Sequence, residues 1–195
     1  MKTPLITIIL AAFAFIGTSQ GQTGMQGSIM LGGGYLEDPG RAYGFLQARG
    51  RFYEDDVFGH TFYLEYLGHV DDAVIEFPVF TRGGGGGTIL EDGDILFSNI
   101  TINYELEAKL SPNFSLFVGG GVGVELIDLD DRFNFTIDSD SNFVSQVFAG
   151  VRMDFGWMFG QAGVRYLMRE DFSLLGDQFV TNDSAGFEIA VGFRF

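Results

Sequence analysis

Cysteine is absent from this 195-residue chain, and proline, histidine and positive charge are scarce. Without cysteine there can be no disulfide framework, no thiolate metal site and no lipid-modified N-terminal cysteine. Only four prolines stand beside 29 glycines and 22 phenylalanines, a composition unlike that of collagen or a disordered linker. The formal net charge of −15 argues against a nucleic-acid partner, because nucleic-acid binding needs a basic surface.

A long apolar run is missing as well. The apolar stretch at 5–16 is shorter than the ~20 residues that a membrane-spanning helix needs. It follows Lys2 and precedes the small-x-small sequence Ser19-Gln20-Gly21, a pattern typical of a cleaved secretory signal. We therefore expect a signal peptide at 1–21 and one domain at 22–195, which could enter a membrane only by strands.

Much of the chain consists of segments in which apolar and polar residues alternate. Eight segments alternate over about the 9–11 residues that a tilted strand needs to cross a bilayer. In the fourth, Ile102 and Tyr104 share one face, while Thr101 and Asn103 share the other. The segments are 26–36, 42–53, 59–70, 96–110, 114–127, 143–155, 158–169 and 185–195. They predict an all-β fold, an eight-stranded antiparallel up-and-down transmembrane β-barrel.

The connections are sorted by length, which is independent support. They are short after the second, fourth and sixth segments (54–58, 111–113 and 156–157) and long after the third, fifth and seventh (71–95, 128–142 and 170–184). Only the first of the expected outer loops, 37–41, is short. Bacterial outer-membrane barrels have short periplasmic turns and longer extracellular loops, so we expect both termini in the periplasm. The connection at 71–95 contains five consecutive glycines, and two interpretations stay open: a hairpin that extends two strands beyond the membrane, or a flexible loop.

Charged residues on the polar faces nearly balance, although the whole chain is strongly acidic. The predicted lumen ion network consists of Arg49, Arg51, Glu65, Glu105, Glu107, Lys109, Glu125, Arg152, Asp154, Arg165, Arg169, Glu188 and Arg194. The interior of an eight-stranded barrel is just wide enough for side chains to fill, and buried charges must be paired. We expect a salt-bridged plug in preference to a catalytic cluster or proton path, with inner-face glycines making room for the arginines.

The remaining acidic residues fall mainly in the predicted turns and loops. One cluster comprises Asp128, Asp130, Asp131, Asp138 and Asp140, and another comprises Glu91, Asp92 and Asp94. Such clusters could hold divalent cations or form a solvated acidic face, which we favour. Aromatic residues near segment ends predict girdles at the membrane interfaces: Tyr35, Phe52, Tyr53, Phe62, Phe97, Phe114, Phe155, Trp157, Phe159 and Phe195.

Signatures of an enzyme are missing. The only histidines, His60 and His69, fall on opposite faces of one strand by the period of two, so they cannot share a metal site within it. The one Gly-x-Ser-x-Gly sequence, at 17–21, falls inside the expected signal peptide, so the domain at 22–195 has no nucleophile elbow of this kind. We therefore expect no enzymatic activity, no cofactor and no metal site.

The final segment resembles the C-terminal signal that the barrel-assembly machinery reads, with apolar residues at Phe187, Ile189, Val191, Phe193 and Phe195. Together with the leader, the eight segments and the sorted loops, it makes 22–195 resemble the small outer-membrane β-barrels, such as the OmpA transmembrane domain and OmpX. This resemblance implies a monomer in the outer membrane of a Gram-negative envelope, in contact with lipid and lipopolysaccharide.

The resemblance to OmpX also connects a long hairpin with surface adhesion. We expect a surface-exposed structural or interaction protein that acts through acidic outer loops. A narrow, porin-like channel for small or hydrophobic solutes, as in OmpW-type barrels, is the alternative, followed by a lipid-modifying enzyme.

Overall fold

The computed structural model describes residues 26–37, 40–80, 86–129, 141–169, 172–174, 177–179 and 183–195. The predicted signal peptide at 1–21 and most of the acidic cluster around Asp130 lie outside these residues. Within the described ranges, no helix is long and apolar enough to cross a membrane.

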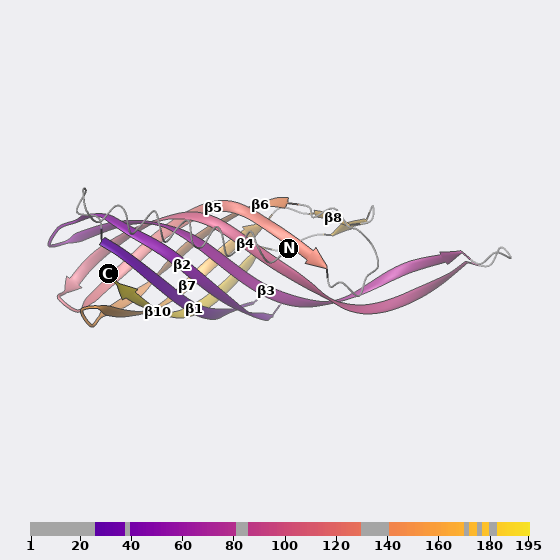
Figure 1. Cartoon of the computed structure of the whole chain (residues 1–195), viewed down its shortest axis with the longest axis horizontal. Helices are drawn as coiled ribbons and strands as arrows, with labels where there is room; N and C mark the ends of the chain where they lie inside the picture. Colours follow the sequence, from indigo (N-terminus) through magenta and orange to yellow (C-terminus); the bar gives the residue numbers. More distant parts are fainter. Residues whose placement is uncertain are drawn as a thin grey trace.

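Eight strands form one closed barrel in which every neighbouring pair is antiparallel (Figure 1). They are β1 (Gln26–Leu36), β2 (Arg41–Glu54), β3 (Phe58–Phe80), β4 (Gly86–Ser111), β5 (Phe114–Leu129), β6 (Ser141–Asp154), β7 (Met158–Arg169) and β10 (Ser184–Arg194). β10 pairs with both β7 and β1, so no strand edge is left open around the wall. This confirms the predicted fold class.

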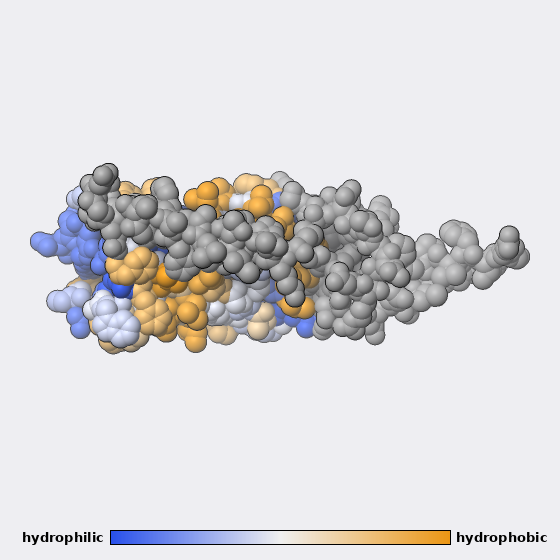
Figure 2. Space-filling view, in the orientation of Figure 1, coloured by the Kyte–Doolittle hydropathy of each residue, from blue (hydrophilic) through white to orange (hydrophobic). Residues whose placement is uncertain are grey.

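The side-chain period of two sorts each strand into an inner and an outer face. On β4, Thr101, Asn103 and Glu105 are buried in the lumen while Ile102 is 65% exposed. On β10, Phe187 and Ile189 point outward on either side of the buried Glu188. The predicted facing of both strands is therefore confirmed. Figure 2 shows hydrophobic residues over the middle of the barrel and hydrophilic residues at the end that carries the C-terminus.

Tight turns close that same end. Between β2 and β3, Asp55 Oδ1 accepts hydrogen bonds from the backbone N–H groups of Phe58 (2.6 Å) and Val57 (2.7 Å). These two donors hold the pKa of the Asp55 carboxyl below its usual value, because they stabilise the charged form. Between β6 and β7, Asp154 Oδ1 accepts from the N–H of Gly156 (2.9 Å), whose φ of +84° requires glycine.

At the opposite end, β3 and β4 continue past their neighbours as a two-stranded ribbon, which we call the long hairpin (Figure 1). Its pairing runs from Asp71 opposite Ile95 to Phe80 opposite Gly86. The hairpin interpretation of 71–95 is thus confirmed over its paired backbone, and the glycines at 83–85 lie outside the described residues. β2 pairs with β3 only as far as His69, and β5 with β4 only as far as Ile95. Among the described strands, both edges of the long hairpin are therefore unpaired.

A small second sheet was not predicted. β8 (Phe172–Leu174) and β9 (Asp177–Phe179) pair antiparallel in the connection between β7 and β10. Three residues are too few to show an alternating period, so the sequence carries no clear signal for them.

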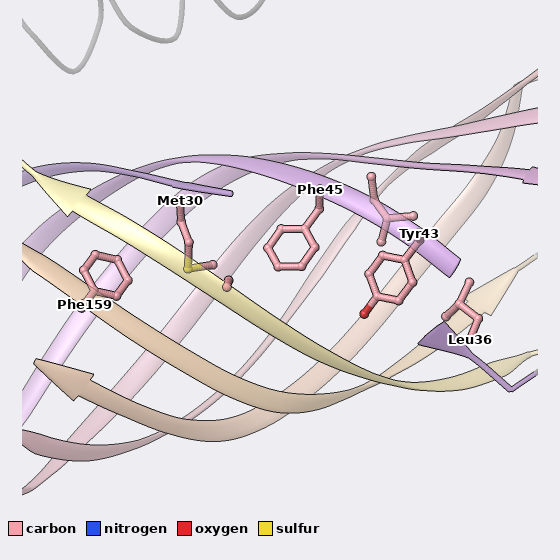
Figure 3. Close-up of a cluster of buried hydrophobic side chains, with 7 residues drawn as sticks. Met30, Leu36, Tyr43, Phe45 and Phe159 are labelled. Atoms are coloured by element: carbon pink, nitrogen blue, oxygen red, sulfur yellow. The ribbon is translucent and has the colours of Figure 1, made fainter. Parts of the chain in front are cut away.

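The hydrophobic core of the molecule lies inside the barrel. One cluster brings buried side chains from several strands together beneath the wall (Figure 3). Its members are Met30, Leu36, Tyr43, Phe45, Leu67, Phe159 and Ala190. A second cluster comprises Tyr63, Phe117 and Phe148. Rings as well as charged side chains are therefore buried inside the barrel.

Candidate functional site

Arg152 of β6 is the centre of one ion cluster in the lumen. Its Nη1 donates to Glu107 Oε2 at 2.6 Å, and its Nη2 donates to Glu105 Oε1 at 2.8 Å. Arg49 Nη2 reaches the same Glu105 oxygen at 2.6 Å, and Arg51 bonds to Glu107. Three arginines and two glutamates from three strands thus form one connected group.

Arg165 of β7 is the centre of a second cluster. It donates to both oxygens of Glu65 and, through Nε at 2.9 Å, to Glu188 Oε2. Gln47 and Gln146 donate to Glu65 at 2.6 and 2.8 Å, so this carboxylate accepts four hydrogen bonds. The Arg165 side chain has no exposed surface, and its charge is compensated entirely inside the protein, as a buried ion requires.

Aromatic rings cover the faces of these guanidinium groups. Arg49 lies over the ring of Tyr63 at 4.5 Å, and Arg152 lies near the rings of Phe117 and Phe159 at 5.2 and 5.0 Å. Such cation–π contacts are strongest where water is excluded. The edges of the arginines are therefore bonded to carboxylates while their faces pack on rings.

A third group of ion pairs closes the end with the tight turns. Arg194 bonds to Asp154, and Lys109 Nζ lies 2.5 Å from Glu54 Oε1. Arg51 Nη1 also reaches Glu54, at 3.1 Å. A polar recess of about 400 Å³ opens beside these groups and is lined by Arg51 and Glu107. Both residues are members of the Arg152 cluster.

Glu54 was assigned to a turn and missed as a network member. A β-bulge shifts the register between Arg51 and Tyr53. The extra residue leaves both Phe52 and Tyr53 on the exposed face and turns Glu54 back toward the lumen. Alternation counted without a bulge gives the wrong face beyond this point.

At the opposite end of the lumen, the charged residues Arg169 and Glu125 form a longer ion pair. Arg169 Nε lies 3.3 Å from Glu125 Oε1, the one ion pair that Glu125 makes within the described part of the chain. The side chains of Asn99 and His69 are buried near this pair's strands as well. The predicted network residues therefore all point inward, but they form two tightly bonded clusters, a rim group and one weakly bonded pair.

Uncharged polar residues complete the two clusters and were not predicted as members. They are Tyr43, Gln47, Thr101, Asn103, Ser115, Gln146 and Gln161. Each lies on the same alternating face as the predicted charges, so the period of two could have found them.

Two expectations about the lumen and girdles are corrected by the structure. The inner-face glycines make room mainly for aromatic rings, not for arginines: a side chain at Gly119 would meet Phe148, and one at Gly192 would meet Phe159. Phe159 itself, together with Phe97, was expected in a girdle, yet both are buried in the lumen. Their odd positions place them on the same inner faces as the lumen charges of β7 and β4.

The two histidines lie on opposite faces of β3, as predicted. His69 is buried in the lumen and stacks on Phe97 with ring centroids 4.8 Å apart. His60 lies on the outer face, where its Nδ1 is 2.6 Å from the hydroxyl of Tyr104. No group of three or more histidine or acidic side chains that could hold a metal occurs among the described residues.

No protein-family model and no curated protein sequence matches the chain. Among solved structures, the fold is similar to Neisserial surface protein A, with a TM-score of 0.51 and 11% identity over 88% of this chain and 96% of that one. A major outer membrane protein from Thermus thermophilus gives 0.49 and 16%, covering 88% and 99%. Ail, the attachment invasion locus protein of Yersinia pestis, gives 0.46 and 17%, covering 88% and 97%.

At these identities the likeness shows the fold alone. The closed barrel of eight strands, its apolar outer belt and its polar interior are the features of a bilayer-spanning barrel. The fold is that of the small outer-membrane β-barrels.

Proposed function

We propose that the protein is a surface-exposed structural or interaction protein of the outer membrane, in which a barrel with a closed lumen anchors the long hairpin outside the cell. The observation that carries the proposal is the pairing of buried charges inside the barrel. Arg49, Arg152 and Arg165 are each only 2% exposed, and their partners come from strands across the barrel. A path for solutes would have to break these ion pairs.

The long hairpin supports the interaction role. It continues β3 and β4 by about ten residues each, which extends the strands by roughly 34 Å at ~3.4 Å per residue. Its unpaired edges could accept a strand from another protein. An isolated two-stranded ribbon is only marginally stable in water, so a partner strand would also stabilise it.

An attachment assay tests this role. In one variant, residues 72–94 are replaced by an Asn-Gly turn, which suits a two-residue hairpin connection. Cells that produce this variant should lose attachment to surfaces coated with extracellular proteins and lose autoaggregation, while the barrel still folds. A control variant that shortens only the 83–85 glycines should keep both properties. Full attachment after removal of the hairpin would refute the proposal.

The alternative channel is tested by solute entry into vesicles. If the lumen is closed, vesicles that contain the protein should swell no faster in small sugars than empty vesicles. Faster swelling would favour the channel.

We also propose that the protein has no enzymatic activity. His60 contacts Tyr104 and His69 stacks on Phe97, and neither contacts a serine among the described interactions. Lipid A from cells that overproduce the protein should therefore be unchanged in mass. Contact with lipopolysaccharide, insertion by the barrel-assembly machinery and a monomeric state belong to the same proposal.

A further inference from the structure

A groove of about 670 Å³ is hollowed into the outer wall of the barrel. It crosses the neighbouring strands β5, β6, β7, β10 and β1. We call it the outer-wall groove. Its outward-facing lining residues are Tyr35, Glu37, Val118, Val147, Ala149, Val164, Tyr166, Ala185 and Phe187.

The hollow arises where small side chains lie among large ones. Residues that face each other on neighbouring strands form a row across the wall, and alanines stand in two adjacent rows. In one row Ala149 lies opposite Val164, which lies opposite Phe187. In the next row Tyr166 lies opposite Ala185. The two alanines leave a depression between large neighbours.

Aromatic rings border this depression. Tyr35 and Phe187 stack with ring centroids 6.2 Å apart on one side. The ring of Tyr166 borders it on the other, and its hydroxyl donates to Asp183 at 3.2 Å. The borders are therefore held in place by contacts of their own.

The groove has one charged end. Glu37, which follows β1, is exposed and lines the groove, and its backbone N–H donates to Ala185 O at 2.7 Å. Arg165 contributes only wall, because its guanidinium is bonded inside the lumen. A bound molecule would thus contact the apolar lining of the groove along its length and the Glu37 carboxylate at one end.

We infer that the outer-wall groove binds one acyl chain of a membrane lipid whose headgroup carries an ammonium group. The groove is continuous with the apolar belt that faces lipid, so its occupant comes from the lipid phase. Its volume lies within the ~300–1,000 Å³ typical of ligand pockets. The Glu37 carboxylate attracts an ammonium group and repels an uncompensated phosphate. The inference rests on the membrane location in the proposed function.

Native mass spectrometry of the folded protein in detergent tests the inference. The protein is titrated with phosphatidylethanolamine or phosphatidylglycerol of identical acyl chains. One molecule of phosphatidylethanolamine should be retained about five-fold more tightly, the upper range for one exposed ion pair. Glu37→Gln should remove this preference but keep binding. Ala185→Leu should fill the groove and abolish retention of both lipids.

Ala162→Leu is the matched control, since Ala162 faces lipid on β7 outside the groove. Equal retention of both lipids by the unaltered protein would overturn the headgroup assignment. So would tighter binding of phosphatidylglycerol once Mg²⁺ is added, which would point to a cation-bridged anionic lipid. If Ala185→Leu behaves like Ala162→Leu, the groove itself is refuted. Failure of the hairpin-deletion assay, by contrast, would leave these lipid results unaffected.

Discussion

Single carboxylates in the lumen differ sharply in how well their charge is compensated. Glu105 accepts from two arginines at 2.6 and 2.8 Å, whereas Glu125, among the described residues, has one arginine at 3.3 Å. Both were predicted as equal members of one network. Sequence alternation determines the face on which each lies, but the number of donors depends on which strands meet across the barrel.

Neutralising these two carboxylates should have unequal effects. Glu105→Gln leaves the buried Arg49 and Arg152 short of negative charge and should lower the free energy of unfolding by ~3–5 kcal/mol. Glu125→Gln should lower it by less than ~1 kcal/mol, since Arg169 has a further partner. Urea unfolding in lipid vesicles measures both. Equal losses would contradict the assignment of two classes of lumen carboxylate.

Outward positions should respond to charge according to depth in the bilayer. Ile102 lies midway along the wall and is 65% exposed, while Leu110 lies at the turn end and is 62% exposed. Ile102→Arg should destabilise by ~2–4 kcal/mol and Leu110→Arg by only ~0–1 kcal/mol. The same unfolding measurement applies. A neutral effect at Ile102 would place this side chain away from lipid.

At the scale of elements, most strand limits could be predicted because alternation and turn residues mark them. β1 and β7 have the expected bounds, and β10 begins one residue earlier than expected. The pairing within 71–95 could not be decided, because a glycine run fits both a loop and a hairpin tip. The bulge at Arg51 and the short β8 and β9 leave no periodic signal.

The close spacing of the neighbouring strands β4 and β5 gives a prediction for glycines. A side chain on Gly123 would collide with the backbone of Ile100 and Thr101, which cannot move aside. Gly123→Ala should therefore lower stability by ~1–3 kcal/mol. Gly44→Ala is the control: its nearest neighbour is Gly32 O at 4.0 Å, so it should be neutral or stabilising by up to ~1 kcal/mol. The reverse order would contradict the strand spacing.

The β2–β3 turn gives a pH dependence. The folded state lowers the pKa of Asp55, so its stabilising effect is complete above the unfolded pKa of 3.8 and is lost as pH falls through the lower folded value. The stability difference between the unaltered protein and Asp55→Ala should be constant near neutral pH and shrink below about pH 4. Unfolding midpoints across pH measure it. A difference that grows in acid would be incompatible with these turn hydrogen bonds.

At the scale of the whole molecule, three regions differ in the side chains they carry and in their shape. The lumen holds paired charges and rings, the outer wall is apolar, and the long hairpin extends past one end. The overall arrangement could be predicted from eight alternating segments and sorted loops. The outer-wall groove could not, because it depends on which small residues become neighbours when five strands lie side by side.

The ion conductance of single barrels in planar lipid bilayers tests the central claim, that paired side chains close the lumen. The unaltered protein should give no stepwise conductance. The double variant Glu105→Ala with Arg152→Ala removes both charges of the central ion pair and should give small, stepwise openings. The closed lumen would be contradicted if the unaltered protein conducted steadily and the double variant showed the same conductance.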